Sequence, residues 1–260
     1  MIEKEILKEE LLKGKSKKQL AADFKISVVT LRKIIKFYNF ENYYCYNKSA
    51  DIQIKNKSVD IDFFKCINNE AKAYTFGLIL SDGYISKDRI VGITLQESDV
   101  DILFKIKDIM QSKHKIATRF KTVGNNCCRF DITSREIVKD LQDLGVTTTK
   151  SFDASIPFNK IPNELIRHVL RGIFDGDGSF SQNRPCIATS SEQLKNDIVN
   201  WSFKNFNYSP SVYTQNNNFR IYFNKEGFKI ICNMYENSNI VLTRKMNSFQ
   251  EYYKYRIKNQ

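Results

Sequence analysis

The chain contains two copies of one helix-like motif, and this repetition constrains its fold more than any other feature. The segments "TFGLILSDGYI" (75–85) and "LRGIFDGDGSF" (170–180) are nearly all-apolar runs that end in an aspartate and a glycine. Asp177 lies 95 residues after Asp82, which is the length of one small half-domain. The sequence therefore predicts two similar halves, each opening with a buried helix.

Both predicted helices carry small residues four positions apart. Gly77 and Ser81 are so spaced in the first copy, and Gly172 and Gly176 in the second. Residues four apart lie on one helix face, and small side chains allow another backbone to approach closely. We therefore expect the two helices to pack as a pseudo-twofold pair, with their terminal aspartates side by side.

Two neighbouring carboxylates at helix carboxyl ends repel each other, and each also meets the negative end of its own helix dipole, at about 0.3–1 kcal/mol. A bound divalent cation would remove this penalty. Oxygen ligands without nearby histidine or cysteine favour Mg²⁺, with Mn²⁺ as a substitute. The predicted metal site comprises Asp82 and Asp177 with the adjoining Ser81, Gly176 and Gly178.

After each motif helix the sequence alternates between strand-like and helix-like segments. In the first half, strands are expected at 89–96, 116–123 and 127–133, and helices at 99–110 and 134–146. In the second half, strands are expected at 211–215 and 219–224, and helices at 196–206 and 225–238. The turns "VGNN" and "QNNN" are typical of hairpins. The fold class is therefore α+β, with the same order of elements twice.

Charge and composition restrict the partners and the location of the protein. Forty-one Lys and Arg against 29 Asp and Glu give a formal charge of +12, which favours a polyanion. No stretch has the roughly 18 uncharged apolar residues of a membrane span, and the acidic amino terminus is unlike a signal peptide. We expect a protein that is not secreted, in the cytoplasm or the compartment holding its target. The six cysteines form no C-x-x-C pair and are expected to be reduced.

The first 40 residues predict a small helical unit. In "SKKQLAADFKISVVTLRKIIKFY" the apolar residues can form one seam between two short helices, with Ser27 as N-cap of the second. The segment resembles a helix-turn-helix, although Lys25 replaces the usual turn glycine. An ordinary helical hairpin with a solvated lysine face is the alternative. If the resemblance holds, the recognition helix would contact DNA through Ser27, Val28, Thr30, Arg32, Lys33 and Lys36.

The two motifs resemble the signatures of the double-motif LAGLIDADG homing endonucleases, and the resemblance covers about 63–255. It is looser in the first copy, at Thr75 and Leu80. It implies a duplicated αββαββα core in which two antiparallel sheets form a saddle over double-stranded DNA. It also implies that Asp82 and Asp177 bind the metals that cut both strands.

The same resemblance implies a basic residue near the end of the last strand of each half and a polar residue on an early strand. Lys225 fits the basic role in the second half, and Arg135 or Ser134 in the first. Gln96 fits the polar role that positions water, with Ser191 or Glu192 as its weaker counterpart. For each, a structural salt bridge or a surface charge is the alternative.

The strands independently predict a nucleic-acid surface, because their polar residues alternate with apolar ones. Arginine is suited to guanine, and asparagine or glutamine to adenine, although a solvated sheet face is the alternative. The outward set is Arg119, Lys121, Arg129, Asp131, Thr133, Tyr213, Gln215, Arg220, Tyr222 and Asn224, and Arg244 and Lys245 are added as basic contacts.

These observations predict a monomeric, metal-dependent DNA endonuclease with a long asymmetric site. Its expected parts are a helix-turn-helix (1–40), a linker (41–62), and two LAGLIDADG halves (63–155 and 156–260). Two alternatives stay open: a DNA-binding regulator that has lost cutting, and an intron RNA maturase. The presence of both aspartates favours the enzyme.

Overall fold

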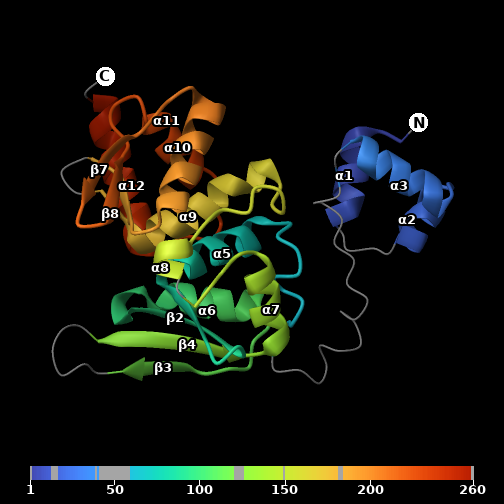
Figure 1. The fold of residues 1–260 in the computed structure, drawn as a ribbon, viewed down its shortest axis with the longest axis horizontal. Coiled ribbons are helices and arrows are strands. Elements are labelled where there is room, and N and C mark those ends of the chain that lie inside the picture. Colours follow the sequence, from blue (N-terminus) through green and yellow to red (C-terminus); the bar gives the residue numbers. More distant parts are fainter. Residues whose placement is uncertain are drawn as a thin grey trace.

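Figure 1 shows the fold in a computed structural model, which describes residues 2–12, 17–38, 40, 59–119, 126–148, 150–180 and 184–258. Of the sequence-based expectations, most of the linker, the tip of the hairpin at 120–125, and with it Lys121, lie outside these residues. For Arg119 only the backbone is described.

The first half begins with helix α5 and continues into one antiparallel sheet of order β1-β2-β4-β3. The N-cap of α5 is Asn69, whose side chain accepts a hydrogen bond from the backbone N of Lys72 at 3.0 Å. The elements are α5 (Glu70–Asp82), β1 (Gly83–Ser86), β2 (Ile90–Gln96), η3 (Glu97–Asp99), α6 (Val100–Ile109), β3 (Ile116–Arg119), β4 (Cys127–Thr133), α7 (Arg135–Asp143) and α8 (Lys150–Asp153).

The second half repeats this order with a sheet of order β5-β6-β8-β7. Its elements are η4 (Asn163–Leu165), α9 (Ile166–Asp177), β5 (Gly178–Ser179), β6 (Cys186–Thr189), α10 (Glu192–Phe206), β7 (Ser211–Gln215), β8 (Asn218–Tyr222), α11 (Phe228–Tyr235) and α12 (Thr243–Lys258). The duplicated α+β fold expected from the sequence is confirmed, with two four-stranded antiparallel sheets.

Helices α5 and α9 cross at the centre, between the two sheets (Figure 1). A Cβ on Gly172 would stand 2.7 Å from the backbone N of Leu78 and would also collide with the carbonyl of Tyr74. A Cβ on Gly77 would collide with the carbonyl of Val169. The small-residue faces therefore bring the two backbones into direct contact, as the sequence predicted.

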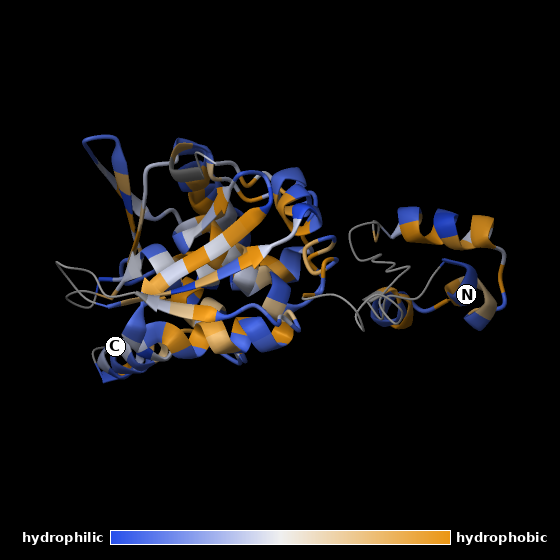
Figure 2. Cartoon of the chain, turned by 90° about the horizontal axis from the view of Figure 1, so that it is seen from below, coloured by the Kyte–Doolittle hydropathy of each residue, from blue (hydrophilic) through white to orange (hydrophobic). Residues whose placement is uncertain are grey.

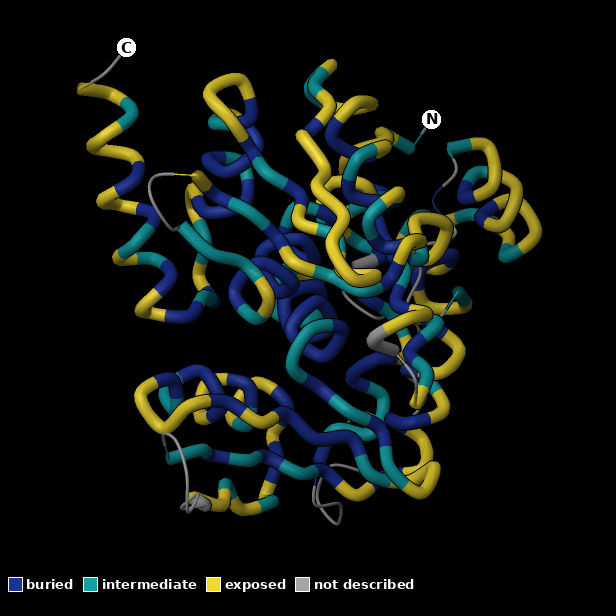
Figure 3. Tube along the Cα trace, turned by 60° about the vertical axis from the view of Figure 1, so that its left-hand side comes forward, coloured by how far each residue is buried: buried dark blue, intermediate teal, exposed yellow. Residues whose placement is uncertain are grey.

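One apolar core extends through both halves and is centred on the crossing helices, which are almost wholly buried (Figure 3). The glycines after the aspartates fit this packing. Gly83 and Gly178 have ordinary extended backbones, but a side chain on either would collide with its own helix, at Ile79 and Phe174 respectively. In each half the backbone thus passes from helix into strand directly after the aspartate.

The amino-terminal helices α1 (Lys4–Leu12), α2 (Lys17–Asp23) and α3 (Val28–Phe37) share a second apolar cluster. Figure 2 shows apolar and polar bands alternating along these helices. Lys25, where a glycine was expected, has a left-handed backbone with φ of 53°. The expected seam is confirmed, because all its members are buried or pack on this cluster: Leu20, Ala21, Phe24, Ile26, Leu31, Ile34 and Ile35.

Some elements differ from the sequence-based expectations. No residue ranges were predicted for strands β1, β5 and β6 or for helix α12, because the strands are short and the helix lacks strong apolar periodicity. Cys66 is disulfide-bonded, so the expectation that all cysteines are reduced is wrong. Within the described ranges, no helix is both long and apolar enough to cross a membrane.

We predict that Gly172→Ala destabilises the protein. Alanine is favoured over glycine in a helix by about 1 kcal/mol, but the added methyl would meet backbone atoms of α5, which cannot move aside, at a cost of about 1–3 kcal/mol or more. Urea unfolding followed by circular dichroism measures the difference. An unchanged or raised free energy of unfolding would show that the helices are not in backbone contact.

Candidate metal centre and nucleic-acid surface

The terminal aspartates of α5 and α9 are brought together by the helix crossing. Gly176, which precedes Asp177, has no room for a side chain because Ser81 and Asp82 of the other helix fill that space. A Cβ at Gly176 would stand 2.8 Å from Oδ2 of Asp82. The carboxylate of Asp82 therefore lies against the backbone next to Asp177, as the motif spacing predicted.

The donors at this point fit a hard divalent cation better than a soft one. The part of the chain that the structure describes holds no group of three or more His, Cys, Asp or Glu side chains that could bind a metal. Two carboxylates with backbone carbonyls are the kind of set in which Mg²⁺ keeps several waters. The carbonyls of Ser81 and Gly176 are candidates, because these two residues meet at the crossing.

Gly178 differs from the other predicted metal ligands. Its carbonyl accepts a hydrogen bond from Nζ of Lys245, so it faces an ammonium group. A cation would be repelled there. The structure therefore does not support Gly178 as a ligand, while Asp82, Asp177, Ser81 and Gly176 remain together.

Lys245 is the functional candidate that the sequence analysis placed on the DNA surface instead. It lies in the first turn of α12 and is only 5% exposed. Burial and the neighbouring charge of Arg244 lower its pKa, while the carboxylates of Asp175 and Asp82 oppose this shift. A buried amine is thus held beside the paired aspartates.

The duplication contains a signal that could have identified this lysine. Lys150 precedes Lys245 by 95 residues, the same spacing that separates the two motif aspartates. "VTTTK" ends at the first lysine and "VLTRK" at the second. Lys150 is the first residue of α8, where only its backbone is described. The pair of lysines repeats with the pair of aspartates.

Arg135 and Lys225, predicted as the basic residues of the two sites, lie away from the aspartates. Strand β1 leaves Asp82 and reaches Ser86, whose partner Ile90 pairs with Thr133 just before Arg135. That is about 10 Å along the strand direction. Lys225 likewise comes after Tyr222, the last residue of β8. Tyr222 pairs with Cys186, and Cys186 pairs with Ser179 rather than with Gly178, the residue next to Asp177.

Ser134, the alternative to Arg135, is the N-cap of α7 and is buried. Its hydroxyl accepts a hydrogen bond from the backbone N of Ile137 at 3.2 Å. The residue has a structural part in starting this helix. Neither first-half candidate is therefore brought to the metal centre.

Gln96, the predicted water-positioning residue, is the exposed last residue of β2. Its second-half counterpart follows from strand pairing: Ile93 pairs with Gly83, and Ile187 pairs with Gly178. This register aligns Gln96 with Ser190. The predicted counterparts Ser191 and Glu192 therefore lie one and two residues after the aligned position.

The two residues expected there have other contacts. Ser191 is fully buried as the N-cap of α10, and its hydroxyl donates to the carbonyl of Ala154 at 2.6 Å. Glu192 forms an ion pair with Lys195 at 3.1 Å. Both contacts support the start of α10.

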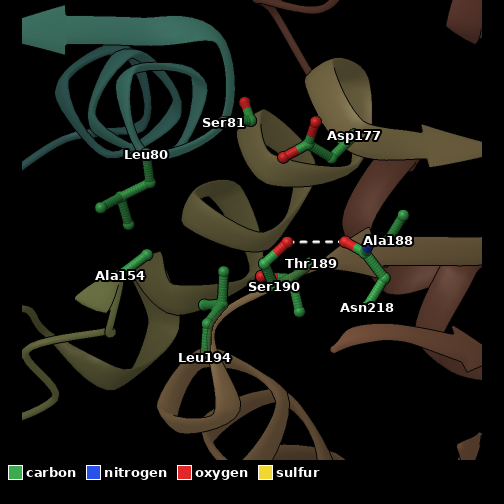
Figure 4. A pocket seen from close by; sticks show the side chains of 9 residues that line it. All are labelled: Leu80, Ser81, Ala154, Asp177, Ala188, Thr189, Ser190, Leu194 and Asn218. Carbon is green, nitrogen blue, oxygen red and sulfur yellow. Dashed lines mark hydrogen bonds between the residues drawn. The ribbon is translucent and has the colours of Figure 1, made fainter. Parts of the chain in front are cut away.

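A pocket of about 230 Å³ opens beside Asp177 (Figure 4). The hydroxyl of Ser190 donates to Oδ1 of Asn218 at 2.6 Å on its wall. Leu80 and Ser81 reach it from the first half, so both halves contribute to one cavity. The remaining lining residues are Ala154, Ala188, Thr189 and Leu194.

The outward faces of the sheets carry several of the residues predicted to contact DNA. Thr133, Tyr213, Gln215 and Arg220 are exposed. The other described candidates have contacts of their own. Arg129 lies near Asp131. The ring of Tyr222 has the guanidinium of Arg184 4.9 Å above it, and Oδ1 of Asn224 accepts a hydrogen bond from Tyr208.

Arg244, whose side chain is 51% exposed, is also held by an ion pair. Its Nη2 lies 2.8 Å from Oδ2 of the buried Asp99, in the first half. The hydroxyl of Thr243 donates to Asp101 at 2.6 Å. The start of α12 is thus attached to the first half, and Arg244 serves that attachment.

On α3, Thr30, Arg32, Lys33 and Lys36 are exposed as the helix-turn-helix interpretation requires. Val28 instead packs against the apolar cluster, and its neighbour Val29 is 61% exposed. Ser27 is exposed, but its hydroxyl accepts a hydrogen bond from the backbone N of Thr30 at 3.0 Å. Val28 is therefore withdrawn from the candidate contacts.

A buried carboxylate links the motif helix α9 to the segment that carries Lys245. Asp175 accepts hydrogen bonds from the hydroxyls of Tyr74 (2.8 Å) and Tyr235 (2.6 Å) and from the backbone N of Leu242 (2.7 Å). Burial raises the pKa of Asp175 to about 6, although the three donors oppose this. The position of Lys245 thus depends on a carboxylate two residues from Asp177.

Comparison with known proteins connects this architecture to a family. Residues 164–253 match the family described as LAGLIDADG-like domain. This match covers most of the second half. A solved structure of "the homing endonuclease I-WcaI bound to its DNA recognition sequence" is similar at a TM-score of 0.53 and 15% identity, over 78% of this chain and 94% of that one. The LAGLIDADG homing endonuclease fold predicted from the motifs is thereby confirmed.

Two further proteins show partial similarity to this chain. The meganuclease I-SmaMI bound to uncleaveable DNA is 13% identical with a TM-score of 0.47, covering 71% of this chain and 89% of that one. Replication factor C small subunit of Methanocaldococcus jannaschii is 24% identical over 132 residues. That match spans half of this chain but only 7% of the relative's length.

We predict that Asp175→Asn changes the dependence of stability on pH. The pKa of Asp175 is 3.8 in the unfolded state and about 6 in the folded state. The stability that Asp175 contributes is therefore fully present below pH 3.8 and is lost as pH rises through about 6. Relative to the asparagine variant, the wild-type free energy of unfolding should fall by about 3 kcal/mol between pH 3.5 and 7.

Urea unfolding at several pH values measures this difference. The raised pKa of Asp140, about 6, and the lowered pKa of His168, about 4, affect both proteins alike and cancel. A difference between wild type and variant that does not vary with pH would show that Asp175 is not the buried group described.

Proposed function

We propose that this chain is a double-strand DNA endonuclease that hydrolyses phosphodiester bonds at a long, asymmetric site. The observation that carries the proposal is the meeting of Asp82 and Asp177 at the crossing of two LAGLIDADG-type helices. A binding module would gain nothing from keeping two repelling carboxylates at helix carboxyl ends. The net charge of +12 supports a polyanionic substrate.

The proposed cofactor is Mg²⁺, with Mn²⁺ as a substitute, held by Asp82 and Asp177 with the carbonyls of Ser81 and Gly176. When bound, the ion supplies positive charge for the phosphate and lowers the pKa of a water molecule. Lys245, buried beside the aspartates, adds a positive charge close to the phosphate. Gln96 and Ser190, at equivalent strand ends, are placed to orient water in the two halves.

The two outward sheet faces would lie along the major groove, one on each half of the site. Asymmetry is expected because equivalent positions differ: Asp131 corresponds to Tyr222, and Ala117 to Tyr213. The amino-terminal unit would extend the footprint through the exposed residues of α3. The proposed parts remain residues 1–40, 41–62, 63–155 and 156–260, acting as a monomer.

The decisive test is cleavage of a library of duplex DNA taken from the sequences that flank the gene, with Mg²⁺ or Mn²⁺. We predict double-strand ends at one position for the wild type. Asp82→Asn and Asp177→Asn should each lower double-strand cleavage by about a thousandfold or more while DNA binding persists. Tight specific binding without any cleavage would instead support a regulator, and preferential RNA binding a maturase.

The same assay tests the basic residue. Lys245→Met should lower the cleavage rate by about a hundredfold, because it removes a charge positioned at the site. Lys225→Met and Arg135→Met are matched controls, since they remove equal charge away from the aspartates, and they should cut at the wild-type rate. A loss of cleavage in the controls with full activity in Lys245→Met would reverse this assignment.

A further inference from the structure

On the outward face of the first sheet, Arg129 is surrounded by side chains in defined positions. Arg129 lies on the inner strand β4, between Thr94 on β2 and Ala117 on β3. Both neighbours are exposed and small, so nothing large covers the guanidinium from these strands. Its side chain is 31% exposed. The residue is therefore accessible but surrounded by fixed structure.

Two further side chains, Asp131 and Tyr84, support Arg129 one behind the other. Nε of Arg129 lies 2.8 Å from Oδ2 of Asp131. The other oxygen of Asp131 accepts a short hydrogen bond from the hydroxyl of Tyr84 on β1. Gly92 lies between them on β2, and a Cβ there would collide with the Tyr84 ring and the Asp131 carboxylate. The glycine makes the contact across the sheet sterically feasible.

This arrangement fixes the guanidinium before any ligand binds. The tyrosine orients the carboxylate, and the carboxylate attracts the guanidinium from its Nε side as an ion pair. Nε itself is buried and its N–H is not aligned for a hydrogen bond with any described residue. The exposed part is thus the outer edge with the two Nη groups, which is the edge that pairs with guanine O6 and N7.

The second half provides an internal comparison. The strand pairing that matches Ile93 with Ile187 also matches Arg129 with Arg220. In the second half, Tyr222 stands where Asp131 would be, Cys186 replaces Gly92, and Ser179 replaces Tyr84. Arg220 therefore has the same place in its sheet, with a tyrosine instead of a carboxylate at the equivalent position.

We infer that Arg129 reads a single guanine in the major groove and that Tyr84 and Asp131 position it for this contact. Asp131 is then a positioning residue rather than a reader of cytosine. Arg220 makes a looser contact, so the two half-sites are read with unequal stringency. The inference rests on the proposed function, because it needs the sheet face to lie on DNA.

The experiment is selection of bound sites from a randomised duplex library by the full chain, followed by sequencing. The wild type should enrich a guanine at one position of one half-site. Arg129→Met should remove that preference alone, by about 5- to 100-fold. Tyr84→Phe and Asp131→Asn should weaken the same position, by about 2- to 10-fold, through loss of restraint on the side chain. Arg220→Met, the matched control, should alter a different position in the other half-site.

The outcomes separate the inference from the proposed function. Thermal unfolding shows whether each variant folds, and Tyr84→Phe removes only one hydroxyl. An unchanged profile for Tyr84→Phe and Asp131→Asn, with the preference lost in Arg129→Met, would overturn the positioning role. A profile unaffected by Arg129→Met would overturn the guanine contact. No enrichment by the wild type would contradict the proposed function itself.

Discussion

The backbone contact between α5 and α9 is the constraint on which the rest of the structure depends. Glycines at the crossing let the two helices approach until main-chain atoms meet, and any side chain there would separate them. Each helix continues into a strand directly after its aspartate. The crossing therefore sets the distance between the carboxylates and the placement of both sheets at once. The proposed metal centre, shared by the two halves, would follow from this packing requirement.

Buried polar contacts tie the last part of the chain to this crossing. Arg171 of α9 is fully buried, and its Nη2 lies 2.6 Å from Oε1 of Glu70 at the start of α5. Glu70 also accepts hydrogen bonds from the backbone and side chain of Asn239. Burial lowers the pKa of Arg171, and the carboxylates of Glu70 and Asp175 oppose this shift. Together with Asp175, these contacts hold the segment before α12, and hence Lys245, in place.

The sequence was most informative where the signal is local. The motif helices, their ends at an aspartate and a glycine, and the small-residue faces were predicted, because a helix face can be derived from spacing alone. The strands β2, β4 and β7 were predicted from alternation. Strand β5 was not, since two residues cannot show a period.

The candidate site was less predictable where it depends on long-range register. Lys245 and Arg244 are adjacent in sequence, yet one is buried beside the aspartates and the other binds Asp99. Lys225 and Arg135 were chosen for their positions near strand ends, but the strands run past the paired aspartates before reaching them. Ser190 was missed by one residue, because its match to Gln96 is set by pairing with β5. In each case a tertiary contact decided the role of a residue type that the sequence supplies many times.

The central claim, that the crossing forces Asp82 and Asp177 to share one cation, is tested most directly by the metal dependence of stability. Thermal unfolding midpoints should be compared for wild type and the Asp82→Asn/Asp177→Asn double variant, with and without Mg²⁺. The account predicts that the variant is at least as stable as wild type without the ion, and that Mg²⁺ raises the midpoint of wild type only. Equal stabilisation of both proteins by Mg²⁺, or a less stable variant in its absence, would contradict it.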